Sequence, residues 1–119
     1  MGISLKRVYE KESENDGYRI LIDGLWPRGI GKKHAHIDEW AKDLAPSNDL
    51  RTWFHHDPDK WYKFKIMYLN ELQTNANVIP QIREILKKAK NGKVTLIYAA
   101  RDEKYNNAVV LKEFLEKNK

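Results

Sequence analysis

The sequence predicts a small three-layer α/β sandwich, in which a mostly parallel or mixed sheet carries helices on both faces. Two observations predict this class. Short apolar strands alternate along the chain with segments of helical periodicity. The strands at 18–23 and 94–99 have consecutive apolar residues, as strands buried on both faces do. The length of 119 residues suits one core, so we expect a single domain over 1–119.

The first third of the chain predicts two or three strands. Residues 3–9 alternate apolar and polar side chains, which predicts a strand, and a polar turn follows it. Residues 18–23 (YRILID) predict the second strand. Residues 25–35 contain Pro and Gly residues that interrupt regular structure and predict a loop. Residues 37–44 are compatible with a strand or a short helix, and we favour the strand.

Three helices are predicted in the middle of the chain. Ser47 is a suitable N-cap for a short helix that ends at residues 55–56, and Asp57, followed by proline, predicts the start of the next. Asn77 opens the third helix, which residues 91–92 end. The expected inward residues are Leu50, Trp53 and Phe54 in the first helix, Trp61, Phe64, Tyr68 and Leu72 in the second, and Ile79, Ile82, Ile85, Leu86 and Ala89 in the third.

The C-terminal third predicts one strand and one helix. Residues 94–99 (VTLIYA) are short, β-rich and apolar on both faces, so this strand should be central in the sheet. Residues 105–114 then predict the last helix. Strand, loop and helix follow one another here, as they do in parallel α/β proteins.

The composition narrows the classes of function. The chain is 41% hydrophobic and 33% charged, the balance of a globular protein. It has no cysteine, which excludes disulfides, thiolate nucleophiles and zinc–thiolate sites. Neither a membrane span nor a secretory signal is visible, so we expect a cytoplasmic protein without membrane association.

The chain is basic, and its charge is unevenly distributed. The net charge is +5, and residues 1–60 hold 10 basic and 11 acidic residues while residues 61–119 hold 12 and 6. A basic surplus can attract phosphate-bearing partners such as nucleic acid or nucleotides. It can equally consist of solvated lysines on the outer faces of helices.

Similar polar residues follow the second and the last predicted strands. Asp23, Trp26 and Arg28 come after the first of these, and Arg101 and Asp102 come after the other. Ligands of open α/β sheets bind beyond the carboxyl ends of the strands. If the two strands are neighbours, these side chains meet at one edge of the sheet. Arg28 and Arg101 would then bind phosphate as bidentate donors. The remaining residues expected to contact the ligand are Trp26, Lys32, Tyr105 and Asn106.

The two aspartates have alternative interpretations. Asp23 and Asp102 could hold a Mg²⁺ ion, which needs only one or two carboxylates besides water and phosphate oxygens. They could instead orient the arginines, with Asp102 capping the last helix, and Trp26 could be a core residue. His56, beside Asp57, is a candidate general acid or base. No zinc-binding residues are assigned, because the four histidines lack an obvious third ligand.

Known nucleotide and hydrolase motifs are absent. In residues 24–32 (GLWPRGIGK), Gly29 is followed by isoleucine, whereas a P-loop requires lysine and then serine or threonine. The chain also has no Gly-x-Ser-x-Gly elbow. ATP or NAD binding by these motifs and serine hydrolysis are therefore not expected.

Three blocks carry a family resemblance: DGLWPRG at 23–29, IDEWAKDLAPSNDLRTWFHHDPDKW at 37–61 and LIYAARDEKYNNAVVLKEFL at 96–115. With them, the chain resembles the YeaO-like branch of the bacterial domain-of-unknown-function family 488 (DUF488). The resemblance implies a small cytoplasmic α/β protein without an assigned activity. The family loop usually has arginine where this chain has Gly24, and often histidine where it has Tyr105.

The sequence leaves three kinds of function open. The first is binding of a phosphate-bearing ligand, nucleic acid or nucleotide, at the carboxyl edge of the sheet, with weak Mg²⁺-dependent nuclease activity as an extension. The second is an enzyme acting on an anionic metabolite, with His56 or Tyr105 as proton donor. The third is a non-catalytic protein interaction module.

Overall fold

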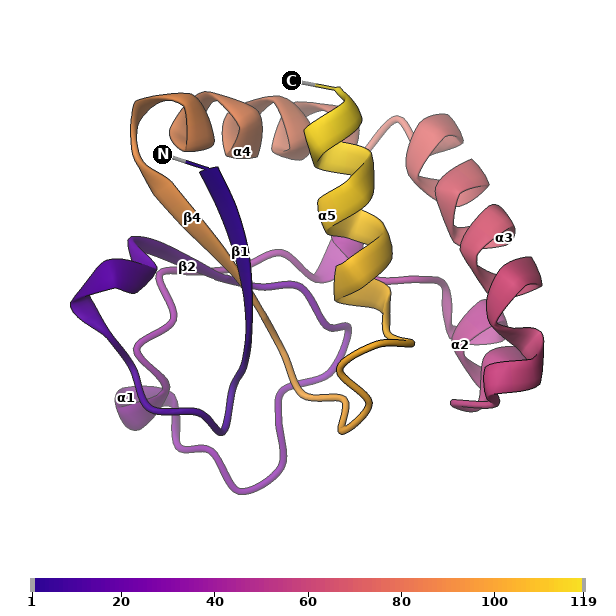
Figure 1. The fold of residues 1–119 in the computed structure, drawn as a ribbon, viewed down its shortest axis with the longest axis horizontal. Coiled ribbons are helices and arrows are strands. Elements are labelled where there is room, and N and C mark those ends of the chain that lie inside the picture. The colour runs from indigo at the N-terminus through magenta and orange to yellow at the C-terminus, as the bar shows by residue number, and fades with distance from the viewer. Residues whose placement is uncertain (1, 119) are drawn as a thin grey trace.

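A four-stranded parallel sheet in the order β1-β4-β2-β3 organises the protein (Figure 1). The computed structural model describes residues 2–118. The strands are β1 (Gly2–Arg7), β2 (Tyr18–Leu21), β3 (Glu39–Trp40) and β4 (Lys93–Tyr98). As predicted, the apolar strand near the C-terminus is central, because β4 pairs with both β1 and β2. The α/β class with a parallel sheet is confirmed.

The helices are α1 (Lys32–Ala35), α2 (Asn48–Phe54), α3 (Trp61–Thr74), α4 (Ile79–Asn91) and α5 (Asn107–Lys117). Short 3-10 turns lie at η1 (Glu14–Asp16), η2 (Lys42–Leu44) and η3 (Pro58–Lys60). Two predicted caps are confirmed. The Ser47 hydroxyl accepts a hydrogen bond from the Leu50 amide at the start of α2. The Asp57 carboxylate accepts one from the Asp59 amide in η3, which leads into α3.

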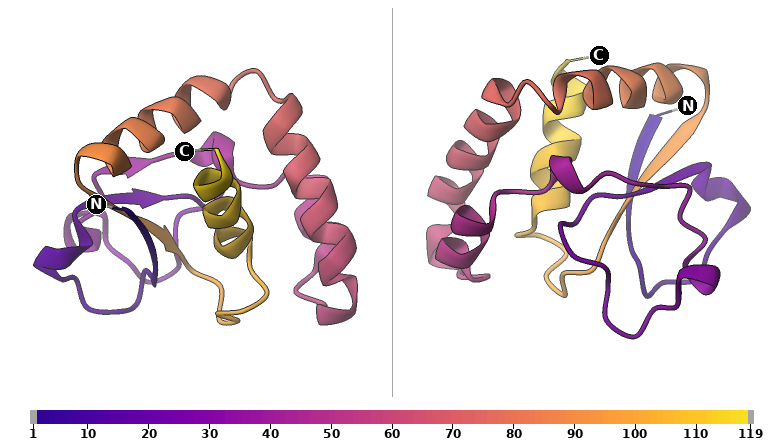
Figure 2. Two further views of the ribbon diagram at one scale, coloured as in Figure 1. Left: turned by 45° about the horizontal axis from the view of Figure 1, so that its top comes forward. Right: turned by 180° about the vertical axis from the view of Figure 1, so that it is seen from behind.

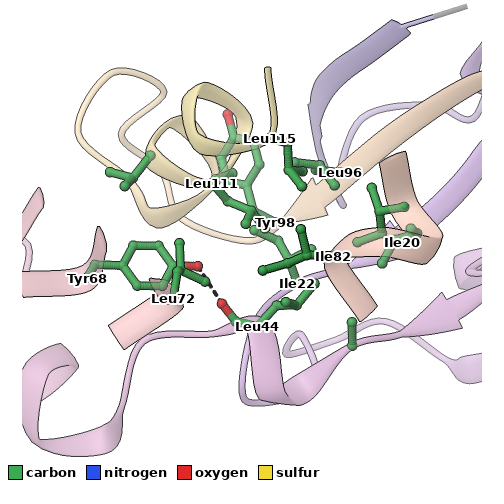
Figure 3. Packing of buried hydrophobic residues seen from close by; sticks show 14 of the residues in the cluster. Ile20, Ile22, Leu44, Tyr68, Leu72, Ile82, Leu96, Tyr98, Leu111 and Leu115 are labelled. Carbon is green, nitrogen blue, oxygen red and sulfur yellow. Dashed lines mark hydrogen bonds between the residues drawn. The ribbon is translucent and has the colours of Figure 1, made fainter. Parts of the chain in front are cut away.

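The two faces of the sheet are covered differently. The main core joins Ile20, Ile22 and Leu96 of one face to buried residues of α2, α3, α4 and α5. In Figure 3, the Tyr68 hydroxyl of α3 donates a hydrogen bond to the Leu44 carbonyl within this core. The opposite face carries Leu21 and Ile97, against which the loop between β2 and β3 packs. That loop includes α1, and it lies in front of the sheet when the molecule is seen from behind (Figure 2).

A buried ionic cluster joins the first turn to the sheet. Asp16 of η1 is bonded to Lys6 of β1 at 2.8 Å and to the Arg19 guanidinium of β2. Arg19 also donates to the backbone carbonyls of Ala35 and His36. One guanidinium therefore ties the short connection between β1 and β2 to the loop that covers the second face.

Several local predictions were wrong. Residues 37–44 hold only the two-residue strand β3 and the turn η2. Helix α4 begins after Val78, not after Asn77, and Ile79 is 39% exposed instead of inward. Trp53 is 37% exposed, and its ring lies under the Lys60 ammonium. Among the described residues, no helix is long and apolar enough to cross a membrane.

Candidate functional site

The carboxyl ends of β2 and β4 frame one cleft. Leu21 and Ile97 are partners in the parallel register of these strands, so the loops that follow leave the sheet side by side. Both loops lie at the lower edge of the sheet in Figure 1, and the end of α2 lies to their right. The two strands are thus neighbours, which is the condition for Asp23 and Asp102 to meet at one edge of the sheet.

The cleft has a volume of about 810 Å³ and combines apolar walls with charged side chains. Trp26, Pro27, Pro46, Phe54 and Phe64 contribute to the walls. The charged or titratable lining residues are Tyr9, Asp23, Arg28, Arg51, His55, His56, Arg101 and Asp102. This size is within the usual range of small-molecule sites, roughly 300–1,000 Å³.

Asp23 lies at the floor of the cleft, where β2 ends. Its carboxylate accepts hydrogen bonds from the Ala99 amide at 2.9 Å and from the Asn107 side chain at 3.3 Å. Its own carbonyl accepts one from the Trp40 indole. Burial raises the pKa of Asp23 above its ordinary value, although the hydrogen bonds from Ala99 and Asn107 oppose the shift. The carboxylate therefore links the ends of β2, β4 and α5.

Asp102 organises the loop after β4. One of its carboxylate oxygens accepts hydrogen bonds from the backbone amides of Lys104 at 2.8 Å and Tyr105 at 2.9 Å. Hydrogen bonds from the Tyr105 and Lys104 amides lower the pKa of Asp102. The N-cap of α5 is Asn106, whose side chain accepts from the Val109 amide and donates to the Asp102 carbonyl. The predicted alternative that Asp102 caps this helix is wrong.

Three arginines surround the cleft without carboxylate partners. Arg28, Arg51 and Arg101 are exposed, and within residues 2–118 none of them forms an ion pair shorter than 4 Å. The Arg51 guanidinium donates a hydrogen bond to the neutral side chain of Asn48, at 3.3 Å, and its positive charge acts to lower the pKa of Asp23 without forming an ion pair. The main chain of Arg28 is fixed by a hydrogen bond from the Tyr9 hydroxyl to its carbonyl. The alternative in which Arg28 and Arg101 pair with Asp23 and Asp102 is therefore not observed.

Trp26 lines the cleft from a rigid position. Its indole N–H donates to the Ile30 carbonyl at 2.7 Å, and its ring packs edge-on against Trp40 at 5.3 Å. Two of the predicted ligand-binding residues lie outside the lining. The Lys32 ammonium is 5.9 Å from the centre of the Trp26 ring, and Tyr105 packs against Trp61 at 5.3 Å.

Two consecutive histidines at the end of α2 adopt left-handed backbone conformations. His55 has a φ of 45° and His56 a φ of 54°, and both residues line the cleft. This conformation costs a non-glycine residue about 1–2 kcal/mol. Strain of this kind is often found at functional sites. The charge of His56 acts to lower the pKa of both Asp23 and Asp102, and all three residues line the cleft.

The predicted Mg²⁺ ligands are already hydrogen-bonded. Asp23 accepts through both carboxylate oxygens, and one oxygen of Asp102 accepts two backbone amides. In the part of the chain that the structure describes, no group of three or more histidine, aspartate or glutamate side chains is placed to hold a metal ion. These carboxylates support the loops around the cleft.

Sequence reasoning missed Arg51 and His55 as members of the site. Arg51 lies in α2 and His55 caps its C-terminus, and the position of this helix beside the sheet edge depends on packing against α3 and not on local sequence. Asn107 follows the last strand in the sequence, but local sequence does not predict its hydrogen bond to Asp23. The only local signal was the presence of polar residues at the end of an amphipathic helix.

Fold and cleft together define a small parallel α/β protein with an arginine-rimmed site at the carboxyl edge of its sheet. A family model described as "Inactive DUF488-N3 subclade" matches residues 2–119. The chain therefore belongs to the DUF488 family, and the resemblance seen in the sequence is confirmed.

The chain is similar to proteins of Escherichia coli and Mycobacterium tuberculosis. The chain is 41% identical over 115 residues to "Uncharacterized protein YeaO" of Escherichia coli K12, covering 97% of each chain. It is 36% identical over 113 residues to "Uncharacterized protein Rv3073c" of Mycobacterium tuberculosis H37Rv, covering 95% of this chain and 92% of that protein. No solved structure gives a significant match.

Proposed function

We propose that this protein binds a phosphate-bearing ligand in the arginine-rimmed cleft and does not transform it. The observation that carries the proposal is the set of Arg28, Arg51 and Arg101, which surround one cleft without carboxylate partners among the described residues. Guanidinium groups bind phosphate through paired N–H donors. An anion would supply the partner that the protein does not.

The N-terminus of α5 adds to the positive potential of the cleft. Asn106 and Asn107 line the cleft at the N-terminus of this eleven-residue helix, where backbone amides and the helix dipole favour anions. Two carboxylates oppose this potential, but both are hydrogen-bonded by the protein. Asp102 accepts two backbone amides, and Asp23 accepts the Ala99 amide and the Asn107 side chain.

Two features support binding without turnover. The two aspartates expected to hold Mg²⁺ are used as acceptors for the loops and for Asn107. The matching family model is described as an inactive subclade. A nuclease or a metabolite enzyme therefore has less support than a binding protein. The ligand stays a phosphate-bearing molecule, with nucleotide and nucleic acid both included.

Replacing Arg28 tests the proposal. Trp26 lies in the cleft, so tryptophan fluorescence should report a titration with pyrophosphate, with nucleoside diphosphates or with a short single strand. Arg28→Ala should weaken the tightest of these complexes by about 10-fold or more, because it removes at least one charge-assisted hydrogen bond to the phosphate. Its unfolding free energy should change by no more than about 0.5 kcal/mol, because the side chain is exposed.

Arg83→Ala is the matched control. Arg83 is an exposed arginine of α4 outside the cleft, so its removal changes net charge equally and should leave affinity unchanged. Equal losses in both variants would reduce the effect to net charge and contradict the proposal. Cleavage of the single strand with Mg²⁺ would contradict binding without turnover.

A further inference from the structure

The charged groups of the cleft are arranged in two levels. The arginines are exposed at the rim, whereas the Asp23 carboxylate and the Asn107 amide lie partly buried at the floor. A phosphate placed against Asp23 would be repelled by its charge. The phosphate of a ligand should therefore remain at the rim, and a different chemical group should reach the floor.

The floor offers acceptors for N–H donors. Each carboxylate oxygen can accept two hydrogen bonds, and in Asp23 each accepts one, from Ala99 or from Asn107. One acceptor position per oxygen is left for a ligand. The surrounding walls are apolar and aromatic, with Trp26, Phe54 and Phe64 among them. A planar ring that carries N–H groups on its edge fits both the walls and the carboxylate.

The positive charge of the cleft is local. The lysines at the end of α4, Lys87, Lys88 and Lys90, lead into Lys93 at the amino end of β4. The cleft lies beyond the carboxyl end of the same strand. The length of the strand, which rises about 3.3 Å per residue, therefore separates these lysines from the cleft. In Figure 1, α4 accordingly crosses the upper end of the molecule. These lysines are therefore not continuous with the cleft. Together with it they do not form the long basic groove along which a nucleic acid strand binds.

We propose, on the basis of the function proposed above, that the ligand is a single nucleoside phosphate, with its base at the Asp23–Asn107 floor and its phosphates at the arginine rim. The cleft volume of about 810 Å³ suits a ligand of this size. Among the bases, guanine presents two adjacent N–H donors, and these match the two free acceptor positions of the Asp23 carboxylate.

The test compares affinities for guanosine diphosphate, ribose 5-phosphate, pyrophosphate and a short single strand. We expect guanosine diphosphate to bind at least about 10-fold more tightly than pyrophosphate or ribose 5-phosphate, because only it reaches both levels. Its affinity should fall only shallowly with salt, since few phosphates are involved.

Variants at the floor separate base recognition from phosphate binding. Asp23→Asn should remove most of the preference for guanosine diphosphate over pyrophosphate, while affinity for pyrophosphate stays equal or rises as a negative charge is lost. Asn107→Ala keeps the carboxylate and its bond to Ala99, and should reduce the same preference even if Asp23→Asn proves unstable.

The possible failures are distinguishable. Equal affinity for guanosine diphosphate and pyrophosphate, or tighter and steeply salt-dependent binding of the single strand, would overturn this inference and leave phosphate binding in place. Failure of all four ligands to bind at low salt would overturn the proposed function itself.

Discussion

At the scale of single residues, the cleft depends on which polar groups are already satisfied. Asp23 and Asp102 have hydrogen-bond donors from the protein, whereas the guanidinium groups of Arg28 and Arg101 have no carboxylate within the described residues. The imbalance leaves the rim with donors and a positive charge. An anion is the ligand that complements it.

Gly24 offers a gain-of-function prediction. It is exposed, lines the cleft and has a φ outside the left-handed region, and an added Cβ would meet only the Ala45 Cβ at 3.6 Å, an ordinary contact. Gly24→Arg should therefore be tolerated and should add a guanidinium to the rim. We expect calorimetry to show affinity for pyrophosphate increased by about 3- to 10-fold, or ~1 kcal/mol.

Gly31→Arg is the matched control for this gain. Gly31 is also an exposed glycine at which an added Cβ would make only an ordinary contact, with the His34 Cδ2 at 3.5 Å, but it does not line the cleft. The same added charge there should leave affinity nearly unchanged. An equal increase in the two variants would mean that long-range charge, and not the cleft, determines binding.

The sequence predicts those residues of the cleft that directly follow a strand. Asp23 and Arg28 come after β2, and Arg101 comes after β4, so the parallel arrangement alone brings them together. Arg51 could not be predicted in the same way. It belongs to α2, whose place beside the cleft is fixed by packing against α3, a contact between segments that local patterns do not describe.

At the scale of elements, Asp16 connects its own turn, η1, to three strands of the sheet. It lies in η1, is about 5% exposed, and contacts Lys6 of β1 and Arg19 of β2. The Thr95 hydroxyl of β4 also donates to its carbonyl. Burial raises the pKa of Asp16, but hydrogen bonds from Lys6 and the Ser13 amide outweigh it and leave the pKa lowered. The ionised carboxylate thus stabilises the connection between β1 and β2.

Asp16→Asn should reveal this contribution as a pH dependence. A carboxyl with a lowered pKa in the folded state stabilises it above the unfolded pKa of about 3.9, and the stabilisation is lost as pH falls through the folded value. At pH 7, chemical denaturation should show the variant less stable by about 1–3 kcal/mol. The difference from the original protein should shrink below pH ~4. A difference that stays constant over this range would contradict the role of the charge.

Helix ends were predictable where the signal is local. Ser47 and Asp57 cap the segments expected of them, because a capping side chain bonds to amides two or three residues away. The start of α4 was misplaced by one residue, since Val78 precedes it without a side-chain cap. The strand β3 was overextended, because its two residues are strand only through pairing with β2.

At the scale of the whole molecule, the fold separates two basic regions. Arginines gather at the carboxyl edge of the sheet, and the lysines of α4 gather at the amino end of β4. The charge count of the two halves of the chain could not show this division, because the cleft draws Arg28 and Arg51 from one half and Arg101 from the other. The net surplus lies mainly away from the site.

The α/β class and the central strand followed from apolar patterning, but the strand order did not. The short link between β1 and β2 skips over the position of β4, and the Asp16 cluster supports this link. Nothing in local periodicity specifies which strands become neighbours. The sequence therefore predicts the cleft only on the condition that the second and last strands are neighbours. The pairing of β2 with β4 meets that condition.

Chemical-shift mapping with pyrophosphate tests the central claim most directly, because it locates the bound anion on the protein. We expect amide shifts to change in three segments, 23–28, 51–56 and 99–107, which meet at the cleft. These changes should saturate, and in Arg28→Ala they should need an about 10-fold or higher concentration of pyrophosphate to do so. Shifts confined to residues 87–93 of the α4 region, or no saturable shifts at low salt, would contradict phosphate binding in the cleft.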